Sequence, residues 1–389
     1  MTTRPGAPWE LAAATLPLRR WALRLLAGAG AGAPPTASPA AWDALLRAER
    51  CALPLKARLG ATELPDGVAA LVERRATAEL QRFLSVGAQT RLTGALLRER
   101  GWPGVVLKGT AHAVEGGEPL DVADVDVLLP REHAVEFAAL LEERGGHRAV
   151  GGADVAGAEG TGWQLAMRLA EGGVQVEVHF DVPFLGAGID AWEGTLATPV
   201  RGVARLSPAN HLWHVLVHGA VHHIERRGQL RELVLLRAAL AGCDAREVEL
   251  VRRRADAHPA APTLRRVLAT VADLAAGTDP GDPFAAEAAA RYGLYAGAAP
   301  SWAPERLRMM MGSAVFALAG GDGDYRALWI GHPSSALVGP GFRGTSRWDR
   351  FALPAWAGRV VWRSAHLAAA TLPAWRVARA ARRLAGGGA

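Results

Sequence analysis

The chain has 389 residues, a length that suggests two or three domains and excludes a single small module. Half of its residues are hydrophobic and 21% are charged, so wholesale disorder is excluded and sizeable cores are possible. Its net charge of +6 permits anionic partners without requiring nucleic acid. Arginine greatly outnumbers lysine: the chain has two lysines, Lys56 and Lys108. A lysine retained despite this bias is a candidate functional residue.

Cysteine usage and hydropathy favour a cytoplasmic protein. Cys51 and Cys243 are far apart and form no CxxC pair, which argues against a disulfide framework and against a cysteine zinc site. No apolar run reaches the ~18 residues of a membrane-spanning helix. The most apolar stretch near the N-terminus contains Arg19, Arg20 and Arg24, unlike a secretory signal.

The first half of the chain changes from helical to strand-like patterns. Apolar residues at three- and four-residue spacing predict helices over 41–53 and 67–100. A short buried strand over 105–107 then leads through Lys108, Gly109 and Thr110 into a short helix. After it, alternation predicts a half-buried strand over 124–129, a helix over 131–144, and a hairpin of strands over 163–169 and 174–180.

The second half is predicted to be mostly helical. Helices are expected from Pro208 to about 240 and over 246–276, followed by a loop-like segment with a short Ala-rich helix and an arginine-rich tail. The fold class is therefore α+β, with a small mixed sheet flanked by N- and C-terminal helical regions. The expected divisions are a helical region 1–95, an α/β core 96–205, a helical domain 206–276 and a C-terminal region 277–389.

An acidic pattern in the predicted sheet carries the clearest chemistry. Asp124 and Asp126 point to one side of their strand about 7 Å apart, and Glu177 on a later strand supplies a third carboxylate. Hard oxygen ligands favour Mg²⁺ or Mn²⁺, ions that assist nucleotide transfer by bridging phosphates. The alternative for such a DxD pattern is a solvated strand face with no ligand.

The order of these motifs resembles the uncharacterised nucleotidyltransferase family within the DNA polymerase β-like superfamily. The resemblance covers roughly 96–240 and rests on the run VVLKGTAHAV…DVADVDVLLP…AVEFAALLEERGG…VQVEVHF…HLWHVLVHGAVHH. It implies that Asp124, Asp126 and Glu177 are catalytic and bind the metal. It also implies that the turn from Lys108 through Gly109 and Thr110 binds the phosphates of an NTP.

The implied activity is a Mg²⁺-dependent, pyrophosphate-releasing transfer of an NMP group from an NTP to a hydroxyl of a small molecule, peptide or protein. Two departures from the family pattern bear on it. No arginine stands just before the DxD, where many members have one, and Phe180 is the aromatic residue after the histidine of the third strand motif. A catalytically inactive binding or scaffold protein of the same fold is therefore the second hypothesis.

Histidines follow one stripe of the helix after Pro208. His211, His214, His218 and His222 are spaced by three and four residues, so His218 and His222 form an HxxxH pair that suits zinc. A zinc enzyme is the third hypothesis. The favoured interpretation is that His218 and His222, together with His179, line a substrate cleft, with Glu232 as a candidate for orienting one of them.

Partners follow from the remaining patterns. Long nucleic acid is not expected, because no arginine-rich stretch with interleaved aromatics lies next to the acidic motif. The tail over 359–383 mixes arginines with apolar residues, which suits either a helix docked on its own protein or a weak contact with a membrane or another anionic partner.

Overall fold

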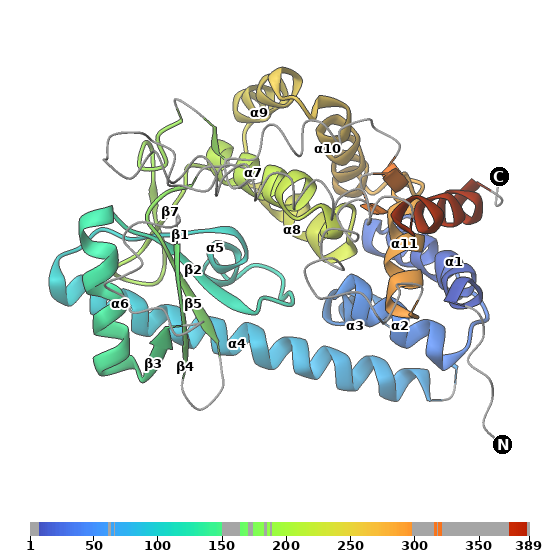
Figure 1. Ribbon diagram of the computed structural model, residues 1–389, viewed down its shortest axis with the longest axis horizontal. Helices are drawn as coiled ribbons and strands as arrows, with labels where there is room; N and C mark the ends of the chain where they lie inside the picture. Colours follow the sequence, from blue (N-terminus) through green and yellow to red (C-terminus); the bar gives the residue numbers. More distant parts are fainter. Residues whose placement is uncertain are drawn as a thin grey trace, which may run out of the picture.

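A computed structural model describes residues 8–60, 64–65, 67–149, 164–169, 174–182, 185–186, 189–297, 315–316, 318–320 and 373–386. In this part of the chain, a small sheet lies at one end of a largely helical molecule, and one long helix runs beneath both (Figure 1). No helix in these ranges combines the length and apolar character needed to cross a bilayer.

The N-terminal helical region is built from α1 (Pro8–Ala27), α2 (Pro39–Glu49), α3 (Ala52–Leu59) and α4 (Val68–Arg100). The single helix predicted over 41–53 is wrong: it is two helices, because Arg50 adopts a left-handed conformation (φ 50°) that ends α2. Ser38 caps the start of α2 by accepting a hydrogen bond from Ala41 N–H. With 33 residues, α4 is about 50 Å long and packs on both α3 and the sheet.

The seven described strands form one mixed sheet in the order β3-β4-β5-β2-β1-β7-β6. The pairs β2–β5 and β1–β7 are parallel and the others are antiparallel. This confirms the predicted α+β class and the predicted pairing of β4 with β5, whose connecting turn lies outside the described residues. The strands are β1 (Val105–Val106), β2 (Asp124–Leu128), β3 (His147–Ala149), β4 (Gln164–Leu169), β5 (Gln175–His179), β6 (Leu196–Ala197) and β7 (Ala204–Arg205).

Strand alternation gives the sheet one apolar and one polar face. Val125, Val127, Val176 and Val178 are fully buried, and Val127 lies on the side of α4, close to Gly104. Two more helices pack on the sheet, α5 (Lys108–Val114) and α6 (Arg131–Gly145). By the same alternation the carboxylates of β2 and β5 lie on the face opposite Val127, where residues of α7 and α8 line the same pocket.

That second region consists of α7 (Pro208–Val217), a π-helix (His218–His222), a short 3₁₀ helix (Ile224–Arg226), α8 (Leu230–Ala241), α9 (Ala245–Ala257), α10 (Ala261–Ala276) and α11 (Ala285–Tyr295). The predicted continuous helix to about 240 is wrong, because the chain turns at Gly228 (φ 64°), where the Phe284 ring leaves no space for a Cβ. The helix predicted over 246–276 breaks at His258, whose extended backbone (ψ 143°) is the conformation favoured before a proline.

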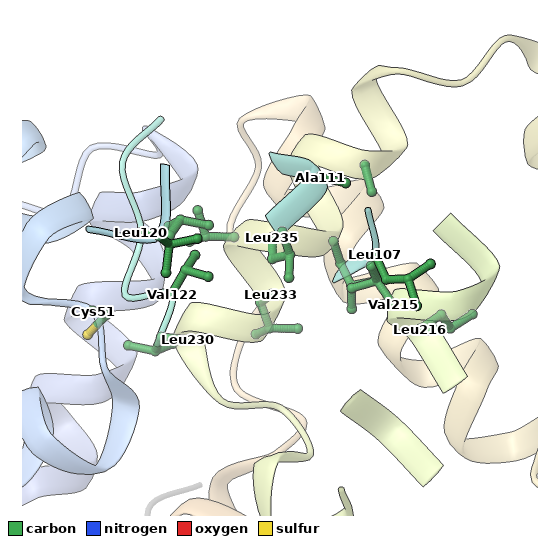
Figure 2. Packing of buried hydrophobic residues seen from close by; sticks show 14 of the residues in the cluster. Cys51, Leu107, Ala111, Leu120, Val122, Val215, Leu216, Leu230, Leu233 and Leu235 are labelled. Carbon is green, nitrogen blue, oxygen red and sulfur yellow. The ribbon is translucent and has the colours of Figure 1, made fainter. Parts of the chain in front are cut away.

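Apolar side chains fix α8 against the sheet domain. Leu233 and Leu235 of α8 belong to the same core as Leu120 and Val122, which precede β2. Figure 2 shows these side chains together with Leu107, at the end of the first strand segment. The helical region is thereby held at a fixed position relative to β2.

A buried polar network joins α1 and α2, near the N-terminus, to α11. Glu49 at the end of α2 is fully buried and pairs with Arg19 of α1 (2.7 Å), while Tyr292 of α11 donates a hydrogen bond to it (2.7 Å). Burial alone would raise the pKa of Glu49, but Arg19, Arg291 and the hydrogen bonds lower it overall. Arg19 also pairs with Asp282 (3.0 Å).

The C-terminal helix over 373–386 docks on the protein itself. Its buried residues Ala374, Val377, Ala378 and Ala381 belong to an apolar cluster that includes Ala289 and Ala290 of α11. Its arginines lie on the exposed side. Of the arginine-rich tail predicted over 359–383, residues 359–372 lie outside the described residues.

Candidate active site

The acidic residues of β2 and β5 face each other because the two strands are parallel and in register. Asp126 lies directly opposite Glu177, and Asp124 lies opposite Gln175. Asp126 is almost fully buried, whereas Asp124 and Glu177 are partly exposed. The backbone hydrogen bonds of the sheet thus fix the spacing of the two carboxylates.

Lys108 lies among these carboxylates. Its Nζ donates a hydrogen bond to Asp126 Oδ1 (2.6 Å) and lies 4.0 Å from Glu177 Oε2. His179 Nε2 approaches the same Asp126 oxygen (2.9 Å) and lies 3.7 Å from Glu177 Oε2. One buried oxygen therefore receives two nitrogen donors, and the four side chains form one electrostatic unit.

The turn between β1 and α5 brings Lys108 to this position. Lys108 has a positive φ of 49°, which is uncommon for a residue with a side chain. The next residue, Gly109, lies so close to Val122 and Arg231 that an added Cβ would stand 3.1 Å from both. The local backbone is therefore shaped to place a lysine at the start of a helix, beside the carboxylates.

Thr110 braces the central strand. Its hydroxyl accepts a hydrogen bond from Asp126 N–H (2.9 Å) and donates one to the Asp124 carbonyl (3.3 Å). The side chain is fully buried and does not line the pocket described below. The structure thus gives Thr110 a strand-positioning contact, and the phosphate binding that the family resemblance implied for it stays a prediction.

The carboxylates and Lys108 open into one pocket between the sheet and α7–α8. It is lined by Lys108, Gly109, Asp124, Asp126, Glu177, Val215, His218, His223, Arg226, Arg231, Glu232 and Leu235. Seven of the ten residues that the sequence singled out, Glu232 included, thus share one pocket. His179 contacts Asp126 without being among the lining residues, and His222 is adjacent to His223.

Burial and mutual charge shift the pKa values of these groups. Burial, together with the charges of Asp126 and Asp124, raises the pKa of Glu177 to about 7. For Asp126, burial is outweighed by Lys108 and His179, and its pKa is lowered. Burial would lower the pKa of Lys108, but the carboxylates raise it overall, so its amine is charged.

The donor set fits a divalent cation. One ligand atom from each of Asp126, Glu177 and His179 lies within 4.8 Å of the others. Two carboxylates suit Mg²⁺ or Mn²⁺. The expected third carboxylate, Asp124, lines the same pocket but does not belong to this cluster of described residues, and burial together with Asp126 raises its pKa.

A model of the family described as "Uncharacterised nucleotidyltransferase" matches residues 38–276, more than half of the chain. The chain belongs to this family. The match is longer than the segment on which the resemblance was based, and it includes α2, α3 and the whole of α4. No curated protein and no solved structure matches the chain. Membership of the family supports nucleotidyl transfer in general.

Two arginines that sequence reasoning missed line the pocket. Arg226 and Arg231 come from the segment around Gly228, about a hundred residues after Asp124 and Asp126. Arg231 is buried, forms an ion pair with Glu232 and donates from Nε to the Asp121 carbonyl (2.9 Å). No local spacing in the sequence indicates this placement, because it depends on how α8 packs on the segment before β2.

The histidine helix also differs from the expected regular stripe. His211, His214 and His218 are buried, and burial is the main cause that lowers the pKa of each of them. The π-helix then brings His223, which sequence reasoning did not select, into the pocket in place of His222. Glu232 pairs with Arg231, and its Oε2 lies next to Gly219 of the π-helix.

Proposed function

We propose that this protein transfers an NMP group from an NTP to a hydroxyl acceptor and releases pyrophosphate. The observation that carries this proposal is the pairing of Asp126 with Glu177 across two parallel strands, in a pocket that Arg226 and Arg231 also line. Carboxylates that suit a metal ion and cations that suit phosphates, gathered in one pocket, form an arrangement complementary to a metal-bound triphosphate.

Asp126 and Glu177 would hold a Mg²⁺ or Mn²⁺ ion, with Asp124 on the same face of β2 and His179 beside Asp126. Such an ion, when bound, neutralises charge on the phosphates and lowers the pKa of an acceptor hydroxyl.

The protein's own groups provide the other requirements of the reaction. Lys108 is charged and donates from a fixed position beside Asp126, so it can neutralise phosphate oxygens together with the Gly109 backbone. Glu177 is partly exposed and lines the pocket, so a carboxylate oxygen of Glu177 that does not hold the ion can accept the proton of the acceptor hydroxyl. His218 lines the pocket and is placed to contact the acceptor, while His179 and His222 adjoin the same space.

A second candidate function is a catalytically inactive binding or scaffold protein. The ion pair between Lys108 and Asp126 favours it, because a protein cation already neutralises the most buried carboxylate. Such a scaffold would use the exposed arginines of the C-terminal helix for a weak contact with a membrane or another anionic partner.

Calorimetric binding of each of the four NTPs, with and without Mg²⁺, tests the proposal. We expect the wild type to bind NTP only with the metal, and Asp126→Asn and Glu177→Gln to abolish this Mg²⁺-dependent binding. Asp256→Asn is the matched control, since Asp256 is an exposed carboxylate on α9. A preparation that binds NTP equally with and without Mg²⁺ would favour the scaffold instead, and failure to bind any NTP would refute the transferase.

The same assay tests the role of the pocket arginine Arg226. Arg226→Gln should weaken NTP binding about tenfold, the loss of roughly 1.4 kcal/mol from one charge-assisted phosphate contact. Arg253→Gln, on the exposed face of α9, should leave the affinity unchanged. Equal effects of the two substitutions would show that only the overall charge matters.

A further inference from the structure

The π-helix between α7 and the 3₁₀ helix gathers three imidazoles. His223 N–H donates to the His218 carbonyl (2.8 Å), five residues back, so the turn is wider than an α-helical turn. In an α-helix only one of residues 222 and 223 would lie beside His218. Here the ring centroids of both lie close to it, at 5.4 Å for His222 and 4.5 Å for His223. Single π turns occur often at functional sites.

These rings are arranged as metal ligands. One ring nitrogen from each of His218, His222 and His223 lies within 4.8 Å of the other two. Tetrahedral zinc, with Zn–N distances of about 2.0–2.1 Å, needs its nitrogens about 3.4 Å apart, so no two of these nitrogens would need to approach by more than about 1.4 Å.

A carboxylate sets the state of the third ring. His223 Nδ1 lies 2.8 Å from Glu225 Oε1, and because the carboxylate accepts the hydrogen bond, Nδ1 carries the proton. In this tautomer of the neutral ring, Nε2 keeps a free lone pair and can bind a metal ion. Carboxylates that hold a ligating histidine in this way are a common feature of zinc sites.

We propose that His218, His222 and His223 form a second metal site that binds a divalent transition metal of the Zn²⁺ type. Three imidazoles favour Zn²⁺ over Mg²⁺, which prefers oxygen ligands, so the two sites differ in the ion they select. A metal with three protein ligands keeps a fourth coordination position, and since His218 and His223 line the same pocket as Asp126 and Glu177, a substrate bound in that pocket would be near enough to supply the fourth ligand. A phosphate or hydroxyl oxygen of a bound substrate is the chemistry that suits this position. The site does not depend on the proposed transferase activity.

Zinc calorimetry in excess Mg²⁺, without nucleotide and on protein free of any histidine tag, tests the site. We expect one Zn²⁺ per chain in the wild type. Glu225→Gln should weaken binding by 10–100-fold, the usual effect of removing a carboxylate that supports a ligating histidine, and His223→Gln should weaken it further. His223 and Glu225 are partly exposed, with side-chain exposures of 29% and 49%, so both variants should fold, which circular dichroism checks.

Two control variants distinguish zinc bound at this site from zinc bound elsewhere on the protein. Asp126→Asn should retain zinc binding, because it alters only the carboxylate site. His133→Gln, on α6, should also retain it, because His133 stacks on Trp102 away from the π-helix. The proposal is overturned if the wild type binds no zinc in excess Mg²⁺, or if zinc is lost in Asp126→Asn and kept in His223→Gln.

Discussion

The two lysines of the chain form two ion pairs of nearly equal length in opposite environments. Lys108 Nζ lies 2.6 Å from Asp126, and their side chains are 14% and 3% exposed. Lys56 Nζ lies 2.7 Å from Glu73, and these side chains are 46% and 58% exposed. The pairs therefore allow the effect of burial to be measured with the same cation at the same distance.

The expected size of the effect follows from these environments. Two unit charges 2.6 Å apart in an effective dielectric of about 20 attract by roughly 6 kcal/mol, part of which is offset by desolvation. Breaking a buried pair typically costs about 3–5 kcal/mol. Because His179 would still contact Asp126, we expect a coupling energy of about 3 kcal/mol between Lys108 and Asp126. For the exposed pair we expect about 0.2–1 kcal/mol.

Two double-mutant cycles in Mg²⁺-free buffer measure these energies. One uses Lys108→Met and Asp126→Asn, the other Lys56→Met and Glu73→Gln, and each compares single and double variants by urea unfolding. Coupling energies of equal size in the two cycles would refute the argument. That result would mean that the negative charge of Asp126 is compensated by its other neighbours rather than by Lys108.

Three further experiments address the fold around the site. Thr110→Val removes the acceptor of the strand N–H and should cost about 1–3 kcal/mol in urea unfolding, whereas Thr110→Ser keeps the hydroxyl and should cost less; equal losses would contradict the brace. Gly228→Ala should lower the stability by at least about 2 kcal/mol because its Cβ would overlap Phe284 at a positive φ, whereas Gly87→Ala, with open space in α4, should raise it by about 0.5–1 kcal/mol. Because the folded pKa of Glu177, about 7, exceeds its ordinary value of 4.5, the folded state binds the extra proton between these values. Stability should therefore fall by up to about 3 kcal/mol as the pH rises from 4.5 to 7, and Mg²⁺ binding should strengthen over the same range. A Glu177→Gln variant whose stability changes with pH as the wild type does would exclude this assignment.

Local periodicity was sufficient to predict which side chains of β2 and of β5 share a face of the sheet. The alternation around Asp124 and Asp126 and that around Glu177 each predict which side chains share a face, and the structure places these residues in one pocket. The sequence alone does not predict that Asp126 lies directly opposite Glu177. This register depends on hydrogen bonds between strands about 50 residues apart in the chain.

Long-range packing explains most of what the sequence did not predict. The interruption of the helix at Gly228 depends on the Phe284 ring, and the position of the pocket arginines depends on how α8 packs. Neither has a signature in the local sequence. The histidine stripe assumed an α-helical period of about 3.6 residues. The π turn changes that period at one point, and His223 therefore replaces the expected His222 on the pocket wall.

The buried network around Glu49 extends beyond the segment that the family model matches. The family match spans 38–276, so it includes Glu49 and excludes both Arg19 and Tyr292, which respectively neutralise and hydrogen-bond this fully buried carboxylate. A chain trimmed to the matched segment would keep the hydrogen bond from Leu230 N–H but would enclose a carboxylate without its main counter-charge. The segment that the family model matches is therefore shorter than the part of this chain that the buried network ties together, and expressing residues 38–276 alone should yield a less stable protein than the full chain.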